Sequence, residues 1–177
     1  MSEPIHNSVP TITAGDHEGY MRLALSLATK SPPKPTNYRV GAVIIDAETN
    51  EVLATGYTLE LPGNTHAEQC CIEKLERRYA AAGTYLAQAL PDSVALYTTV
   101  EPCSQRLSGN TPCVDRILAV GRRIKAVYVG MQEPDTFVGE NSSRKKLEDA
   151  GIDVVLVGGL EKDILEIATA GHEGQAS

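Results

Sequence analysis

The chain has 177 residues, a length that favours one domain with a sizeable buried core. Its net charge of −7 argues against a broad surface for the nucleic-acid backbone, and one Phe, seven Tyr and no Trp are too few for base-stacking platforms. No apolar run approaches the ~20 residues that cross a bilayer, and the polar N-terminus lacks the pattern of a secretory signal. The sequence therefore predicts a cytoplasmic protein with no nucleic-acid and no membrane partner.

The pattern along the chain predicts a polar, flexible N-terminal arm, residues 1–15, followed by a single domain, residues 16–177. Apolar residues at helical spacing predict five helices, at residues 19–28, 67–82, 113–120, 142–150 and 160–170, and Thr111 is expected to be the N-cap of the third. Runs of apolar residues bounded by turn residues predict five strands, at residues 40–45, 52–57, 94–100, 125–130 and 153–157.

The order of these elements indicates the fold class. The first two strands are separated by a short turn and are expected to form a hairpin. After that hairpin, strands and helices alternate, which is typical of a parallel region with helices on both faces of the sheet. The sequence therefore predicts a three-layer α/β/α sandwich.

Four residues carry the pattern of a metal-dependent active site. His66 and Glu68 stand at the start of one predicted helix, Cys103 follows a strand within Glu-Pro-Cys, and Cys113 opens a later helix. Zinc binds nitrogen and sulfur ligands tetrahedrally, and three protein ligands leave the fourth position for water. The pattern predicts Zn²⁺ held by His66, Cys103 and Cys113, with both thiolates stabilised near helix starts and with Glu68 moving protons.

Other interpretations of the same residues stay open. Thr65 and Glu68 also match a capping box, which only stabilises a helix start. The cysteines also suit a hydrophobic core, where free Cys is common. A sharper rival is a closed structural zinc site: His66 and Cys70 share a helix face, and with the two later cysteines they would leave no open position.

At these motifs the chain resembles the cytidine deaminase superfamily, and within it the pyrimidine deaminases of riboflavin biosynthesis. The likeness runs from about Tyr20 to Val157. The insert between the two predicted cysteine ligands, Ser-Gln-Arg-Leu-Ser-Gly-Asn-Thr-Pro, looks like that of the fungal enzymes, as does the ending Ala168–Glu173. The motifs that carry the resemblance are residues 21–25, 40–44, 56–57, 66–68, 101–104, 111–115 and 133–134.

This resemblance implies a cytidine deaminase-like sandwich with a central mixed five-stranded sheet, a zinc ion and a homodimer. It implies a zinc-dependent hydrolase that removes the 2-amino group, as ammonia, from a small phosphorylated substrate. That substrate is a 2,5-diamino-6-(ribitylamino or ribosylamino)pyrimidinone 5′-phosphate. The alternatives are a deaminase of guanine, deoxycytidylate or tRNA adenosine, or a zinc-stabilised module without catalysis.

The resemblance also supplies candidate substrate contacts. Asn37 matches the family's asparagine that hydrogen-bonds the pyrimidine, and the backbone N–H of Ala67 matches the donor to a ring carbonyl. Ser104, Arg106 and Asn110 lie in the insert, where the Arg106 guanidinium suits a bidentate contact with the phosphate. Each has an ordinary alternative, because Asn favours turns and a loop arginine is commonly solvated.

The remaining histidines are expected to have no role. His6, His17 and His172 fall in predicted loops or tails, where exposure is the ordinary expectation. Residues 171–177 are expected to be a frayed end.

Overall fold

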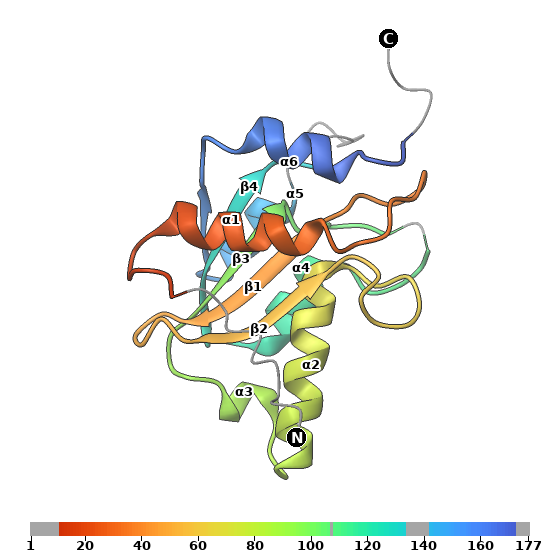
Figure 1. Ribbon diagram of the computed structural model, residues 1–177. Coiled ribbons are helices and arrows are strands. Elements are labelled where there is room, and N and C mark those ends of the chain that lie inside the picture. The colour runs from red at the N-terminus through yellow and green to blue at the C-terminus, as the bar shows by residue number, and fades with distance from the viewer. Residues whose placement is uncertain (1–10, 107, 134–141, 173–177) are drawn as a thin grey trace, which may run out of the picture.

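The computed structural model describes residues 11–106, 108–133 and 142–172, and shows a five-stranded sheet between two layers of helices (Figure 1). None of the described helices has the length and apolarity needed to span a membrane. The strands are β1 (Gly41–Asp46), β2 (Val52–Tyr57), β3 (Val94–Val100), β4 (Ile124–Met131) and β5 (Asp153–Leu156). The helices are α1 (His17–Ala28), α2 (Ala67–Ala81), α3 (Leu86–Ala89), α4 (Cys113–Val120), α5 (Ser142–Asp149) and α6 (Glu161–Ala168).

The sheet has the strand order β2-β1-β3-β4-β5. β1 pairs antiparallel with both β2 and β3, whereas β3, β4 and β5 are parallel to one another. The sheet is therefore mixed, as expected. β3 lies at its centre, and every residue of that strand is buried.

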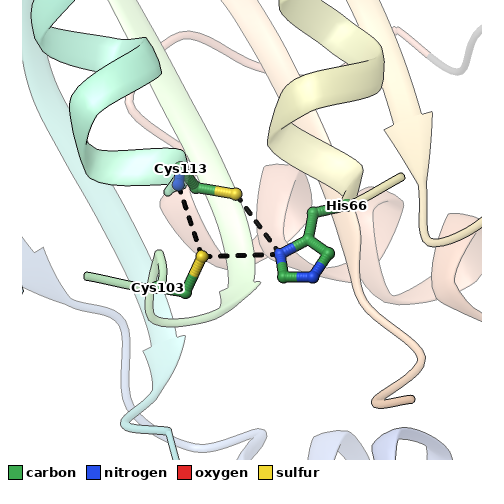
Figure 2. Close-up of side chains that lie close together, drawn as sticks. All are labelled: His66, Cys103 and Cys113. Atoms are coloured by element: carbon green, nitrogen blue, oxygen red, sulfur yellow. Dashed lines mark hydrogen bonds between the residues drawn. The ribbon is translucent and has the colours of Figure 1, made fainter. Parts of the chain in front are cut away.

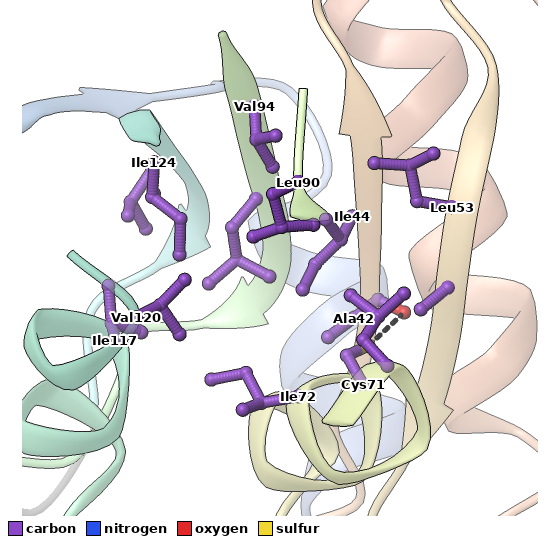
Figure 3. Packing of buried hydrophobic residues seen from close by; sticks show 14 of the residues in the cluster. Ala42, Ile44, Leu53, Cys71, Ile72, Leu90, Val94, Ile117, Val120 and Ile124 are labelled. Atoms are coloured by element: carbon purple, nitrogen blue, oxygen red, sulfur yellow. Dashed lines mark hydrogen bonds between the residues drawn. The ribbon is translucent and has the colours of Figure 1, made fainter. Parts of the chain in front are cut away.

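Helices cover both faces of the sheet, which confirms the three-layer prediction. On one face, α1 and α6 enclose a cluster that includes Tyr20, Tyr97 and Ile164. On the other face, α2, α3, α4 and α5 enclose a larger cluster that includes Ile72 and Ile117 (Figure 3). Burial of these apolar side chains is the main force that holds the layers together.

The start of α1 and the N-cap of α4 differ from the prediction for identifiable reasons. α1 begins two residues early because the side chain of Asp16 accepts a hydrogen bond from the Gly19 N–H, at 2.9 Å, and caps the helix. At α4 the predicted N-cap, Thr111, is wrong. Pro112 holds that position in an extended conformation, with φ −60° and ψ 151°, and the chain becomes helical only at Cys113.

The sequence also missed α3, which is too short for a periodic signal but buries Leu86. The other predicted elements end within two residues of the observed ones. Of the predicted N-terminal arm, residues 1–10 lie outside the described residues, so that boundary stays a prediction.

A glycine in β2 brings α2 close to the sheet. A Cβ at Gly56 would lie 2.4 Å from the carbonyl oxygen of Ala67 and 3.0 Å from the Cys71 sulfur. Only a residue without a side chain allows this approach. The contact fixes the first turn of α2, and the start of that helix carries the predicted metal ligand His66.

Candidate metal centre and active site

The three predicted metal ligands come from separate segments that meet beyond the carboxyl end of β3. His66 immediately precedes α2 in an extended conformation, with φ −91° and ψ 161°. Cys103 lies in the loop after β3, and Cys113 is the first residue of α4. In sheets with parallel strands, this carboxyl edge is where ligands commonly bind.

The donor atoms of these residues are close enough to share one ion. His66 Nδ1 lies 3.5 Å from the sulfur of Cys103 and 3.4 Å from that of Cys113 (Figure 2). Tetrahedral zinc, with bonds of about 2.3 Å to sulfur and 2.0 Å to nitrogen, needs sulfur–nitrogen separations of roughly 3.5 Å. All three donors lie within 4.8 Å of one another. The arrangement therefore fits zinc with one coordination position left open.

Cys103 is not at a helix start, contrary to the prediction. A different donor stabilises its thiolate, because the backbone N–H of Cys113 points at the Cys103 sulfur from 3.3 Å. Hydrogen bonds from the Cys113 thiol, from His66 and from this N–H lower the pKa of Cys103 to about 4. The Cys113 thiol, which donates to Cys103 and is buried, has a raised pKa. Without metal the pair thus keeps one proton, and metal binding would release it.

Cys70 takes no part in this cluster. Its thiol points instead at the carbonyl oxygen of Tyr57, at 3.5 Å, and burial raises its pKa. The metal-binding group found among the described residues consists of His66, Cys103 and Cys113 alone. The closed four-ligand site is therefore not formed.

Glu68 lies in the first turn of α2 with only 3% of its surface exposed. Its carboxylate accepts a hydrogen bond from the hydroxyl of Thr98 on β3, at 2.9 Å. Burial raises the pKa of the Glu68 carboxyl above its ordinary value. The capping-box interpretation fails, because Thr65 donates to the carbonyl of Leu61. A buried carboxylate with a raised pKa suits proton transfer near neutral pH.

A cavity of about 260 Å³ opens beside the cluster. Its lining includes His66, Glu68 and Cys103, and it also includes Asn37 and Arg106. Its walls thus combine metal-binding groups, a proton-transfer group and polar side chains, which is the usual make-up of a small-molecule site.

The structure brings only part of the predicted substrate set to this cavity. Asn37 and Arg106 line it, whereas Ala67, Ser104 and Asn110 are not among its lining residues. Ala67 is buried between His66 and Glu68, so its position beside the cavity still follows from its neighbours.

The side chains of Asn37 and Arg106 are held in place by hydrogen bonds. The Asn37 amide donates to the side-chain oxygen of Asn64, at 2.9 Å. The Arg106 guanidinium donates to Gln69, at 3.0 Å, and to the carbonyl of Asn64. Gln69 in turn accepts from the His66 N–H, at 3.4 Å, so this network ties the insert to the start of α2.

Reasoning from the sequence gave no role to Glu133, which lines the same cavity. Burial and the nearby thiolate and carboxylates raise the pKa of Glu133 to about 7. The carboxylate of Glu101 accepts from the Glu133 N–H, at 3.5 Å, and from the Ser143 hydroxyl at the start of α5. The Glu-Pro motif after β4 could have indicated that Glu133 lies at the site, because β4 is parallel to β3 and the two strands end side by side.

Comparison with known proteins identifies the family. The family model for the cytidine and deoxycytidylate deaminase zinc-binding region matches residues 14–131. The chain belongs to this family. Membership confirms that this deaminase is a zinc-binding enzyme, and the zinc cluster and cavity described above lie within the matched region or next to it.

Individual relatives narrow the comparison. This deaminase is 36% identical over 169 residues to the diaminohydroxyphosphoribosylamino-pyrimidine deaminase of Schizosaccharomyces pombe. The matched region covers 96% of this chain but only 39% of that relative. It is also similar to Aspergillus oryzae Rib2 deaminase, whose crystal structure at pH 4.6 is that of a C-terminal deletion mutant. The sequence identity is 46% and the TM-score is 0.78, and the match covers 89% of this chain and 93% of that one.

A second structure of the Aspergillus oryzae Rib2 deaminase is a complex with DARIPP, with 44% identity and a TM-score of 0.76. It covers 89% of this chain and 92% of that one. These structures confirm the predicted fold class, and together with the Schizosaccharomyces pombe relative they confirm the resemblance to fungal pyrimidine deaminases.

Proposed function

We propose that this deaminase acts in riboflavin biosynthesis, where it hydrolyses the 2-amino group from a 2,5-diamino-6-(ribitylamino or ribosylamino)pyrimidinone 5′-phosphate and releases ammonia. One observation carries the proposal: three zinc donors lie close together, and the cavity beside them is also lined by a buried carboxylate, that of Glu68. The identity of 36% with the Schizosaccharomyces pombe pyrimidine deaminase supports this choice of substrate.

In the proposed mechanism His66, Cys103 and Cys113 hold zinc, which when bound acidifies a water molecule and so supplies a nucleophile near neutral pH. Glu68 lines the same cavity as His66 and Cys103, and its side chain is buried. The Glu68 carboxylate takes one proton from the water and passes it to the ring nitrogen, while the hydroxide adds to the ring carbon that carries the amino group. Glu68 then takes the second proton from the new hydroxyl group and gives it to the amino group, which leaves as ammonia when its C–N bond breaks. The raised pKa of Glu68 favours its protonated form during these transfers.

Asn37 and Arg106 are assigned as substrate contacts because they line the cavity. Ala67, Ser104 and Asn110 are assigned because of their places in the sequence. Asn37 presents an amide to the ring, and the backbone N–H of Ala67 would bind a ring carbonyl. Arg106 would hold the phosphate: its two observed hydrogen bonds go to neutral oxygens, and a guanidinium has five N–H groups. Ser104 and Asn110 would act from the same insert. If the dephosphorylated substrate bound as tightly as the phosphate ester, the assignment of Arg106 would be wrong.

We also propose a cytoplasmic homodimer. The thiolate ligands favour a reducing compartment, because oxidation would remove them. A single sedimenting species with the mass of one chain would contradict the dimer.

Replacing Glu68 tests the proposed chemistry. Glu68→Gln keeps the size and the hydrogen bond to Thr98 but removes the proton acceptor, so kcat is expected to fall by about 10²-fold or more. The measurement is ammonia release from the ribitylamino and ribosylamino forms, with cytidine as the comparison substrate. Glu76→Gln, an exposed change on the same helix, is the control and is expected to retain wild-type kcat.

Two results would contradict the proposal. Turnover of cytidine without turnover of either pyrimidinone phosphate would exclude the riboflavin substrate. Unchanged kcat in Glu68→Gln would exclude the proton-transfer role and favour a zinc-stabilised module.

A further inference from the structure

His172 is not an exposed tail residue, contrary to the expectation from the sequence. Its Nε2 lies 2.8 Å from the backbone carbonyl oxygen of Asn37, so the ring N–H donates to that oxygen. Its ring also lies beside that of Tyr38, with centroids 5.1 Å apart. A histidine near the end of the described chain thus contacts a loop 135 residues away in sequence.

Two further contacts join the end of α6 and the residues after it to the same loop. Gly171, with φ +94°, packs so closely that a Cβ there would lie 2.8 Å from the Lys34 nitrogen and 2.9 Å from the Pro33 carbonyl carbon. The Arg39 N–H donates to the carbonyl of Ala168, at 3.0 Å. Residues 168–172, here called the C-terminal segment, therefore hold residues 33–39, which lie between α1 and β1 (Figure 1).

Residues of this loop also line the catalytic cavity. Thr36, Asn37 and Tyr38 line it, and the Asn37 side chain donates a hydrogen bond to Asn64, another lining residue. The loop belongs to no strand, and it contains one isolated β-bridge, between Lys34 and Asn37. Its position therefore depends on what packs against it, and the C-terminal segment provides such contacts.

We infer that His172 is a positioning residue for substrate binding: by fixing the backbone of Asn37 it aims the Asn37 amide into the cavity. Gly171 assists by allowing the close backbone approach. The inference rests on the proposed function, because it takes Asn37 as a contact of the pyrimidine ring. It extends that function by assigning part of the substrate affinity to a segment outside the deaminase motif.

The inference predicts an effect on binding and not on chemistry. Glu68 and the three zinc donors lie on α2, α4 and the loop after β3, and none of them is among the contacts of the C-terminal segment described above. A ring contact made equally in the bound substrate and in the transition state changes KM with kcat nearly constant. Loss of a fixed Asn37 should therefore appear in KM.

The test compares two histidine replacements with a matched control. His172→Ala removes the hydrogen bond and the ring contact, and KM for the pyrimidinone phosphate is expected to rise about tenfold with kcat within about twofold. His172→Gln retains a donor at the place of Nε2 and should restore KM to within about threefold of wild type. The control, His17→Ala, removes one hydrogen bond to Tyr97 and one ring stack on Tyr128, at the far end of α1. It should leave KM unchanged.

A glycine pair keeps the inference testable if His172→Ala folds poorly. Gly171→Ala and Gly151→Ala both place a side chain at positive φ, at +94° and +84°, so they share the backbone strain. Only Gly171→Ala meets the loop, because nothing lies within 4 Å of a Cβ at Gly151. A rise in KM is expected for Gly171→Ala alone.

The outcomes distinguish a failure of the positioning role of His172 from a failure of the proposed function. If wild type releases ammonia from the substrate but KM is the same in His172→Ala and Gly171→Ala, the positioning role is wrong and the function stands. A fall in kcat at constant KM also overturns the positioning role. If wild type has no activity, the function fails, and hydrogen exchange still decides: amides of residues 36–40 must exchange faster in His172→Ala than in His17→Ala, or the inference is rejected.

Discussion

The hydroxyl of Thr98 lies within hydrogen-bond distance of two acceptors, the Glu68 carboxylate at 2.9 Å and the Val100 carbonyl at 2.8 Å. A hydroxyl has one proton, so it can donate to only one of them at a time. When Glu68 is ionised, Thr98 donates to it. When Glu68 is protonated, it donates to Thr98, which then donates to Val100. The same heavy-atom positions thus satisfy both states of the proton-transfer group.

Replacing Thr98 by an isosteric residue tests this role. Thr98→Val removes the hydroxyl and leaves a buried carboxylate short of one partner, so kcat is expected to fall about tenfold or more with KM unchanged. Thr98→Ser keeps the hydroxyl and should retain most of kcat. Thr99→Val is the matched control, because the Thr99 hydroxyl accepts instead from the Gly41 N–H, at 3.2 Å. Equal kcat in Thr98→Val and wild type would show that the contact is only structural.

The residues of the site differ in how far the sequence could predict them. His66, Glu68, Cys103 and Cys113 are residue types with specific chemistry at a recognisable spacing, and the structure brings them together. Thr98 and His172 could not be found this way. Their contacts cross 30 and 135 residues of sequence, and a threonine or a histidine in those contexts has no distinctive pattern. Such contacts depend on packing that only the folded chain defines.

At the scale of elements, prediction succeeded where burial imposes a strong pattern. β1 and β3 are buried along their whole length, and so appear as continuous apolar or β-branched runs. Prediction failed where the outcome depends on one or two residues, as at the N-cap of α4 and in the short α3. The close packing of β2 on α2 was also not predictable, because Gly56 alone does not reveal its neighbour.

Substituting Gly56 is expected to disturb this packing and the site together. Gly56→Ala would press a methyl group against the Ala67 carbonyl, 2.4 Å away, and overpacking of this kind costs about 1–3 kcal/mol of unfolding free energy. Because His66 adjoins the displaced turn, zinc affinity should fall too. Urea unfolding and zinc titration measure both effects. Gly158→Ala, whose nearest neighbour would be 3.5 Å away, should change neither, and equal behaviour of the two variants would contradict the packing argument.

For the molecule as a whole, the zinc cluster joins segments that the sheet alone does not tie together. His66 stands at the start of α2, Cys103 in the loop after β3, and Cys113 at the start of α4. A ligand that binds the folded state and not the unfolded one stabilises the fold in proportion to the logarithm of its concentration. Metal removal should therefore lower stability as well as abolish activity.

The expected size of this effect follows from mass action. Free zinc at 100 times its Kd contributes about 2.7 kcal/mol. For a domain of this size each kcal/mol moves Tm by about 2–4 °C, so Tm should be about 5–10 °C higher with zinc than after chelation. Differential scanning calorimetry of the same sample with chelator and with zinc restored measures the difference.

Two cysteine variants connect that shift to the proposed ligands. Cys103→Ala removes one of the three donors, so its Tm should respond little to zinc or chelator. Cys70→Ala removes a thiol that points at the Tyr57 carbonyl, so the zinc-dependent shift should persist even if the overall Tm falls. Loss of the shift in both variants would mean that Cys70 joins the metal after all. The open coordination position on which hydrolysis depends would then not exist.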